Sequence, residues 1–286
     1  MSIKDLTQKS FSVLIIRSFG VLLLFAFTLF ITNFFTAENV GRYDFVRSTL
    51  MVLGGLALMG TNQSIIYYSG LLKARKSIES IISIYFKMLR IIISFSLIIL
   101  GLFLCLFNES TITQIFNSTE SYSLILKSIF TLIFFSTTML NIDTIRALQN
   151  TILSEMYRSL FRYIPVFIFA IILIQYNQQH YLVEAYLLGF VLLSVFSGIK
   201  VINMLAGLKK VNKESKKFSI REIFKTSAPM ALSAIAYFIM QSIDIIILSI
   251  YEGFDQIAYC SVSVKLAMVT TLALMSVNIV IAPRIA

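Results

Sequence analysis

Apolar runs of about 20 residues or more recur along almost the whole chain. A helix needs about 20 apolar residues to cross the ~30 Å hydrocarbon core of a bilayer. The runs are continuous rather than alternating in polarity with a period of two residues, so they favour helices over the strands of a β-barrel. A single water-soluble core is also excluded, because 58% of the residues are hydrophobic and only 13% are charged. We therefore expect an all-α, polytopic membrane protein with about eight transmembrane helices.

Short loops separate most of the expected crossings. The crossings are Val13–Asn33, Phe45–Gly70, Ile81–Phe107, Tyr122–Ile145, Leu160–Tyr176, Tyr181–Leu205, Ala228–Tyr251 and Ile257–Ile285. The fifth is the shortest, and it begins beside Arg158 and Arg162, whose long side chains would have to extend to the membrane surface. The second carries a surface of small residues, which predicts close packing against another helix: Gly54, Gly55, Ala57 and Gly60.

The net charge of +10 is explained by membrane topology rather than by a nucleic-acid partner. With both termini in the cytoplasm, every Lys and Arg lies on the cytoplasmic side except Arg42, Arg47, Lys127 and Lys265. This distribution follows the positive-inside rule. The sequence therefore predicts a multi-pass protein with a cytoplasmic N-terminus and no bound nucleic acid.

One helix sequence occurs twice in the chain. The segment LALMGTN at Leu56–Asn62 returns as LALMSVN at Leu272–Asn278, 216 positions later. The same shift gives eight identities over positions 43–62, and a Tyr and an Asn are among them. A shift of six crossings keeps the orientation of each helix, as in transporters built from parallel repeats.

The repeat predicts three parts of the chain. We expect an N-terminal lobe of six transmembrane helices at 1–206, a basic cytoplasmic linker at 207–226 and the first two helices of a second lobe at 227–286. The basic residues of the linker would either contact anionic lipid headgroups or only keep this segment on the cytoplasmic side, as the positive-inside rule expects. A complete second lobe would need about four more helices by the same repeat logic, so we expect the chain to be truncated at its C-terminus.

The second copy resembles a known family. In the segment that starts at Phe224, Pro229 opens the seventh crossing, Asp244 lies midway along it, Tyr259 follows the outward loop and Pro283 closes the eighth. This pattern, and the early segment from Asn39, resemble polysaccharide flippases of the Wzx type, in the multidrug/oligosaccharidyl-lipid/polysaccharide exporter superfamily. The resemblance implies a first six-helix lobe like that of the MATE exporters, followed by the first two helices of a second lobe.

The resemblance also implies a function and partners. Such a flippase moves undecaprenyl-pyrophosphate-linked oligosaccharide repeat units across the bacterial inner membrane by alternating access, for O-antigen, capsule or exopolysaccharide synthesis. The implied partners are this lipid-linked oligosaccharide, membrane lipids and the polysaccharide polymerase machinery. No catalytic residue is implied, because a flippase makes and breaks no bond.

Cations inside the expected crossings are the first candidates for substrate binding, because an ionisable group there is costly unless it faces a partner or a water-filled cavity. They are Arg17 in the first crossing, Arg47 in the second, Lys87 and Arg90 in the third, and Lys265 in the eighth. Their guanidinium and ammonium groups would hold phosphate oxygens. A purely structural role is also open to each of them. Arg17, Lys87 and Arg90 would extend to the membrane surface, and Arg47 and Lys265 would pair with Asp44 or with lipid headgroups.

Asp244 is a carboxylate expected deep inside a crossing, in the segment QSIDIIILS. It would either couple transport to protons or sodium or form a structural ion pair. Asp143 and Arg146 are spaced to pair with each other on the fourth crossing. No metal site and no other cofactor are predicted, because the single His180 lies in a polar loop and the two cysteines form no motif.

Two alternatives to a flippase remain open. A drug or metabolite exporter of the same superfamily would share the two lobes, but it would need an acidic, aromatic cavity for cationic drugs, whereas the intramembrane charges here are mainly cationic. A truncated gene product that does not transport is the second alternative. An enzyme is disfavoured, because the sequence contains no DxD, HExxH, GxSxG or Gly-rich phosphate loop.

Overall fold

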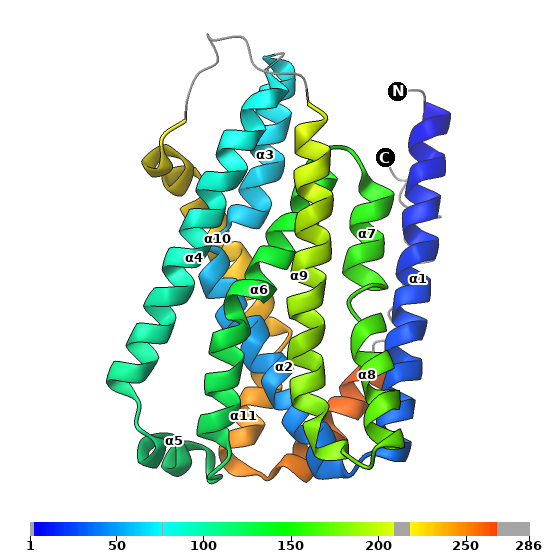
Figure 1. Ribbon diagram of the computed structural model, residues 1–286, viewed down its shortest axis with the longest axis vertical. Coiled ribbons are helices and arrows are strands. Elements are labelled where there is room, and N and C mark those ends of the chain that lie inside the picture. The colour runs from blue at the N-terminus through cyan, green and yellow to red at the C-terminus, as the bar shows by residue number, and fades with distance from the viewer. Residues whose placement is uncertain (1–2, 76, 209–217, 268–286) are drawn as a thin grey trace.

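The computed structural model describes residues 3–75, 77–208 and 218–267, and every regular element within them is helical, as expected. The helices form one bundle (Figure 1). They are α1 (Ile3–Phe34), α2 (Ala37–Leu58), α3 (Thr61–Ala74), α4 (Ile81–Leu106), α5 (Glu109–Phe116), α6 (Ser121–Ala147), α7 (Thr151–Ser159), α8 (Ile164–Gln175), α9 (Leu182–Ala206), α10 (Ile220–Met240) and α11 (Ile243–Tyr251), with short 3-10 turns at Ile78–Ser80 and Gln179–Tyr181 and a last helical segment at 254–267.

The two ends of the bundle are distinct. The end at which α1 begins and α9 finishes is called here the linker end, and the sequence predicts that it faces the cytoplasm. The opposite end carries the short helix α5 and is called here the α5 end (Figure 1).

Six helical stretches in the described residues are long and apolar enough to cross a membrane, and the bent pair α2–α3 makes a seventh if it counts as one crossing. The six are Phe11–Phe34, Ile78–Leu106, Ser121–Ala147, Thr151–Gln175, Gln179–Ala206 and Ile220–Met240. They coincide with the first and the third to seventh expected crossings, so the protein is an all-helical, polytopic membrane protein. The eighth is described only as the helix at 254–267. Its remainder, including the second copy of the repeat, lies outside the described residues.

The second crossing is not one continuous helix, because α2 and α3 meet at an angle of 44°. Met59 and Gly60 between them have positive φ angles of 44° and 72°. A Cβ on Gly60 would lie 2.3 Å from the Ser227 carbonyl oxygen and 2.6 Å from the Ala231 nitrogen of α10. Glycine is therefore required at this bend both for its backbone conformation and for the close approach of α10.

The small-residue surface predicted on the second crossing does pack closely. A Cβ on Gly54 would lie 2.3 Å from the ring of Phe135 on α6, and a Cβ on Gly55 would lie 2.9 Å from the ring of Phe238 on α10. The absence of these side chains lets α2 lie between α6 on one side and α10 on the other.

The expected start of the fifth crossing at Leu160 was wrong. This crossing begins at Thr151 and consists of α7 and α8, with a break at residues 160–163. Pro165 in the first turn of α8 lacks a backbone N–H and restricts the residue before it, which favours a helix start at this point. Arg158 and Arg162 consequently lie inside the crossing rather than at its edge.

The seventh crossing also begins earlier than expected and is also broken. Ser219 caps α10, and its side chain and that of Glu222 form a capping box, so the helix begins at Ile220 instead of Ala228. Pro229 lies inside α10 without ending it. The helix stops at Met240, and α11 begins at Ile243 after two turn residues.

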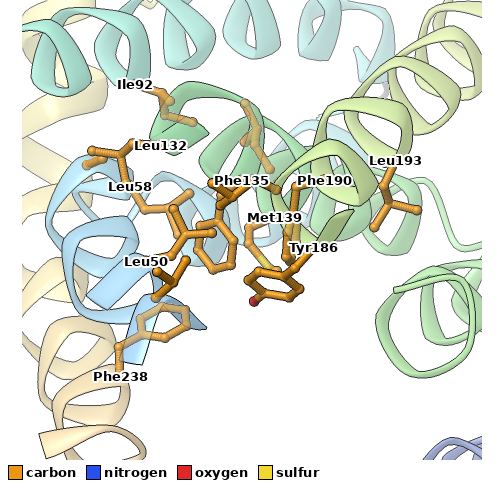
Figure 2. Close-up of a cluster of buried hydrophobic side chains, with 14 of the residues drawn as sticks. Leu50, Leu58, Ile92, Leu132, Phe135, Met139, Tyr186, Phe190, Leu193 and Phe238 are labelled. Atoms are coloured by element: carbon orange, nitrogen blue, oxygen red, sulfur yellow. The ribbon is translucent and has the colours of Figure 1, made fainter. Parts of the chain in front are cut away.

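The apolar core is centred on α6, which packs against α9, α2, α3 and α4. Figure 2 shows Leu50 and Leu58 of α2 beside Phe135 and Met139 of α6 and Phe190 of α9, all of them buried. The rings of Phe135 and Phe190 have centroids 5.0 Å apart. This packing joins α2, α6 and α9 into one body.

A neutral hydrogen-bond network crosses the same core. The Tyr85 hydroxyl of α4 donates to Asn141 Oδ1 on α6 over 2.6 Å, and Asn141 Nδ2 donates to Ser197 Oγ on α9 over 2.9 Å. All three side chains are buried. Because polar groups in hydrocarbon must find partners, the network fixes how α4, α6 and α9 face one another.

We predict that Gly60→Ala destabilises the protein, because a left-handed Ala costs ~1–2 kcal/mol and its Cβ would overlap the α10 backbone. Gly70→Ala is the matched control, since a Cβ there has no atom within 4 Å. It should leave stability unchanged or slightly raised, because Ala favours a helix over Gly by up to ~1 kcal/mol. Thermal unfolding in detergent, followed by circular dichroism, should give a lower Tm for Gly60→Ala. Equal Tm values for the two variants would contradict the assigned role of Gly60.

Candidate functional site

A buried carboxylate on α2 binds cations from two distant segments of the chain. Asp44 is completely buried, and Lys265 places its Nζ 2.6 Å from Oδ1 and 2.8 Å from Oδ2 of Asp44. Arg47, one turn along α2, donates from Nε to Oδ1 over 3.2 Å, and Ser261 donates its hydroxyl to Oδ2. The Lys265 side chain is only 3% exposed. A charge buried here without a partner would cost several kcal/mol, so these groups depend on one another.

Arg162 adds a third cation from the break between α7 and α8. Its guanidinium carbon lies 5.5 Å from the ring centroid of Phe190, and the group interacts with the Tyr186 hydroxyl and with the like charge of Arg47. No carboxylate among the described residues forms an ion pair with it. Lys265 Nζ in turn lies 5.4 Å from the ring centroid of Tyr43. We call the following residues the cationic cluster: Tyr43, Asp44, Arg47, Arg162, Tyr186 and Lys265.

The cluster has the composition of an anion-binding site. The cluster holds three cations and one carboxylate, which pairs with two of them, so the group carries a net positive charge. Tyr43 Oη and Arg162 Nε are buried and have no hydrogen-bond partner within the described parts of the chain. Both are donors that an oxyanion would satisfy. Arg groups bind phosphate and carboxylate oxygens in a bidentate manner, and the attraction is stronger in a low-dielectric interior than in water.

Two more ion pairs continue from the cluster towards the linker end. Arg158 of α7 lies 2.5 Å from Asp143 of α6, and Glu155 of α7 lies 2.9 Å from Arg17 of α1. Both carboxylates are nearly buried. Glu155, Arg158 and Arg162 are separated by three and four residues, a spacing that keeps side chains near one face of a helix. Charged groups therefore follow α7, with the two carboxylates buried and the two cations partly exposed.

The expected pair between Asp143 and Arg146 was wrong. Arg146 is exposed at the end of α6, whereas Asp143 is buried and faces α7, where Arg158 is its partner. The prediction considered neighbours on one helix only, and the buried carboxylate is paired across two helices.

The five predicted cations lie in three different places. Arg47 and Lys265 meet in the cationic cluster, where both contact Asp44. Arg17 pairs with Glu155 and is half exposed. Lys87 donates to the Phe218 carbonyl oxygen over 2.5 Å, and Arg90 is exposed on α4. A role in substrate binding stays a prediction for all five.

Asp244 lies outside the cluster. It is exposed, in the first turn of α11, directly after the break that separates α11 from α10. Ser242 at this break donates to the Met51 sulfur over 3.7 Å. The coupling role of Asp244 stays a prediction.

Asp44 and Arg162 are the functional candidates that the sequence reasoning missed. Asp44 was placed in the outward loop before a crossing at Phe45, but Thr36 caps α2 and accepts a hydrogen bond from the Asn39 amide, so the helix begins at Ala37. This N-cap signal in the sequence would have placed Asp44 in the second turn of the helix. The segment from Thr151 is polar, so the fifth crossing was predicted to begin later than it does. Arg162 was therefore expected at the edge of the crossing and not inside it.

Comparison with known proteins finds no relative of the chain. No protein-family model, curated protein or solved structure matches it. Any proposal of function therefore depends on the cationic cluster and on the resemblance drawn from the sequence.

We predict that Asp44→Asn destabilises the protein by ~3–5 kcal/mol, because it leaves Lys265 and Arg47 buried without a counter-charge. Glu184→Gln is the control, since its ion pair with Lys127 is solvent-exposed and such a pair contributes ~0–1 kcal/mol. Thermal unfolding in detergent should show a strongly lowered Tm for Asp44→Asn and little change in Tm for Glu184→Gln.

The double variant Asp44→Asn, Lys265→Met should recover part of that loss, because it removes the unpaired ammonium along with its partner. A double variant as unstable as the sum of the two single variants would show that the two residues do not interact.

Proposed function

We propose that the chain is a flippase, which translocates undecaprenyl-pyrophosphate-linked oligosaccharide repeat units across the bacterial inner membrane for O-antigen, capsule or exopolysaccharide synthesis. The main support is the cationic cluster, in which Arg47 and Lys265 pair with the carboxylate of Asp44 and Arg162 lies nearby against the ring of Phe190 without an ion pair to a described carboxylate. The sequence resemblance points to the same family. The proposed protein is a transporter and not an enzyme.

The chemistry of the cluster fits a lipid pyrophosphate. Arg47 and Arg162 offer planar groups for bidentate contact with phosphate oxygens, and Lys265 offers a point charge. Ion pairs along α7 supply further cations towards the linker end, namely Arg158 and Arg17. A pyrophosphate that enters from that end would exchange one cationic partner for the next without losing its charge compensation in the hydrocarbon.

The same contacts suggest how substrate binding would drive alternating access. Lys265 and Ser261 belong to the helix at 254–267, so their bonds to Asp44 tie α2 to the part of the chain that follows the linker. An anion bound to Lys265 competes with Asp44 and weakens this tie. The α5 end would then open, while on the linker-end side of the bend at Gly60 Ser64 and Ser227 hold α3 and α10 together through a neutral hydrogen bond of 2.7 Å.

A drug exporter fits the cluster less well. A cationic drug would meet three positive charges and one carboxylate that is already paired. Asp244, at the start of α11, is the residue that would couple transport to protons or sodium in either case. The proposed substrate is therefore the anionic lipid, and the proposed coupling ion would bind separately, at Asp244.

Ligand-induced thermal stabilisation of the purified protein in detergent tests the proposal. Undecaprenyl pyrophosphate should raise the Tm, since a ligand at 100 times its Kd adds about 2.7 kcal/mol to stability. Undecaprenol, which lacks the charge, and the cationic drug ethidium should raise it much less. Stabilisation by ethidium but not by the pyrophosphate would reject the flippase in favour of the drug exporter.

The variant Arg162→Gln should lose most of the stabilisation by undecaprenyl pyrophosphate. Arg162 is suitable because it forms no ion pair with a described carboxylate, so its removal breaks none of those pairs. Lys127→Gln, which removes an exposed cation at the α5 end, should keep the stabilisation. Equal shifts in both variants would place the pyrophosphate outside the cationic cluster.

A further inference from the structure

An apolar groove of about 440 Å³ lies on the side of the bundle near the α5 end. Its walls come from α2, α4, α5, α6 and α11, and Thr49 is the only lining residue that is not apolar. We call this groove the α5 pocket, and its main lining residues are Leu56, Phe103, Ile112, Ile125, Ile129 and Ile246.

The α5 pocket opens on the outer surface of the bundle. Leu56, Leu102 and Ile115 line it and are 38%, 53% and 39% exposed, whereas Phe103 and Ile112 deeper inside are 7% and 4% exposed. The pocket therefore has exposed residues at its mouth and buried residues at its base. In Figure 1, α4 descends to α5 along one side of the bundle, away from α1. In a polytopic membrane protein, this surface faces the hydrocarbon of the bilayer.

We infer that the α5 pocket binds one acyl chain of a bilayer phospholipid from the leaflet at the α5 end. Water is unsuited to it, because a bound water needs two to four polar partners and the walls offer only the Thr49 hydroxyl. An unfilled groove would forfeit the dispersion contacts of its lining atoms. A flexible hydrocarbon chain is the component of a bilayer that restores these contacts and can enter sideways through an apolar mouth.

The position of the pocket favours a phospholipid over the polyprenyl tail of a transported substrate. Leu56 follows Arg47 by nine residues, about two and a half turns of α2, so the two side chains leave the helix on opposite sides. A substrate with its pyrophosphate in the cationic cluster would have to pass around α2 to place its tail in the α5 pocket. The inference thus concerns a second ligand and does not depend on the proposed function.

The bound chain would contact both parts of the molecule that the linker connects. Ile246 of α11 follows the linker, whereas Phe103 of α4 and Ile125 of α6 precede it. A displacement of α11 relative to α4 and α6 would reshape the pocket. The acyl chain therefore occupies the joint between these two parts and stabilises their present arrangement.

Tryptophan fluorescence can test the inference directly, because the chain contains no tryptophan. Three single-tryptophan variants are compared in vesicles of phosphatidylcholine with brominated acyl chains, which quench tryptophan on contact. Phe103→Trp reports on the pocket, Leu97→Trp on the lipid-facing surface of α4, and Phe27→Trp on the buried side of α1. Phe103 and Phe27 are 7% and 0% exposed, and Leu97 is 54% exposed.

Phe103→Trp should lose most of its fluorescence, as Leu97→Trp does, while Phe27→Trp should lose little. Quenching of Phe103→Trp as weak as that of Phe27→Trp would overturn the inference. If Phe103→Trp fails to fold by size-exclusion chromatography, Phe116→Trp on α5 tests the same pocket with the same criterion. Non-brominated undecaprenyl phosphate should not restore the fluorescence at low molar ratio. Restoration of the fluorescence would overturn the assignment to a phospholipid and would show that the pocket binds a polyprenyl chain.

Discussion

The buried contact between Asp44 and Lys265 is the constraint on which the arrangement of this protein depends. Neither charge is compensated by solvent, so α2 and the helix at 254–267 must pack with these two side chains in contact. Arg47 and Ser261 complete the coordination of the carboxylate, and they fix the rotation of α2 and of the helix at 254–267 about their own axes. Apolar packing alone leaves such rotations poorly determined in a membrane, because lipid is as apolar as the helices.

The helical state of the long apolar runs and their order along the chain were predictable, because the cost of exposing backbone amides to hydrocarbon forces every apolar run of sufficient length to be helical. The count of eight crossings stays a prediction, because six or seven lie in the described residues and the end of the eighth lies outside them. The breaks in these helices were not predictable. They are the bend at Gly60, the interruption before Pro165 and the gap after Met240. Each depends on how neighbouring helices pack, and the local pattern of hydrophobicity does not show this. Amphipathic α7 escaped prediction for the same reason, because its polar face is compatible with an apolar environment only when Asp143 and Arg17 lie opposite to it.

The candidate site was predictable only in part. Arg47 and Lys265 stood out because the positive-inside rule disfavours cations at that end, and pairing with Asp44 was among the structural roles expected for them. The involvement of Arg162 requires the fold, since residues 44, 162 and 265 are far apart in the sequence. Asp143 shows the limit of local reasoning, because a cation three residues away is a weaker partner than one that a neighbouring helix places against the buried carboxylate.

The Asn141 network has a consequence for motion. It joins α4, α6 and α9 through uncharged groups, and each bond is shielded from ions and from bulk solvent. Changes in ionic strength or membrane potential therefore act on the ion pairs around the network and leave its hydrogen bonds intact. The three helices α4, α6 and α9 should therefore move as one unit, and their amides should be among the slowest in the described part of the chain to exchange hydrogen for deuterium.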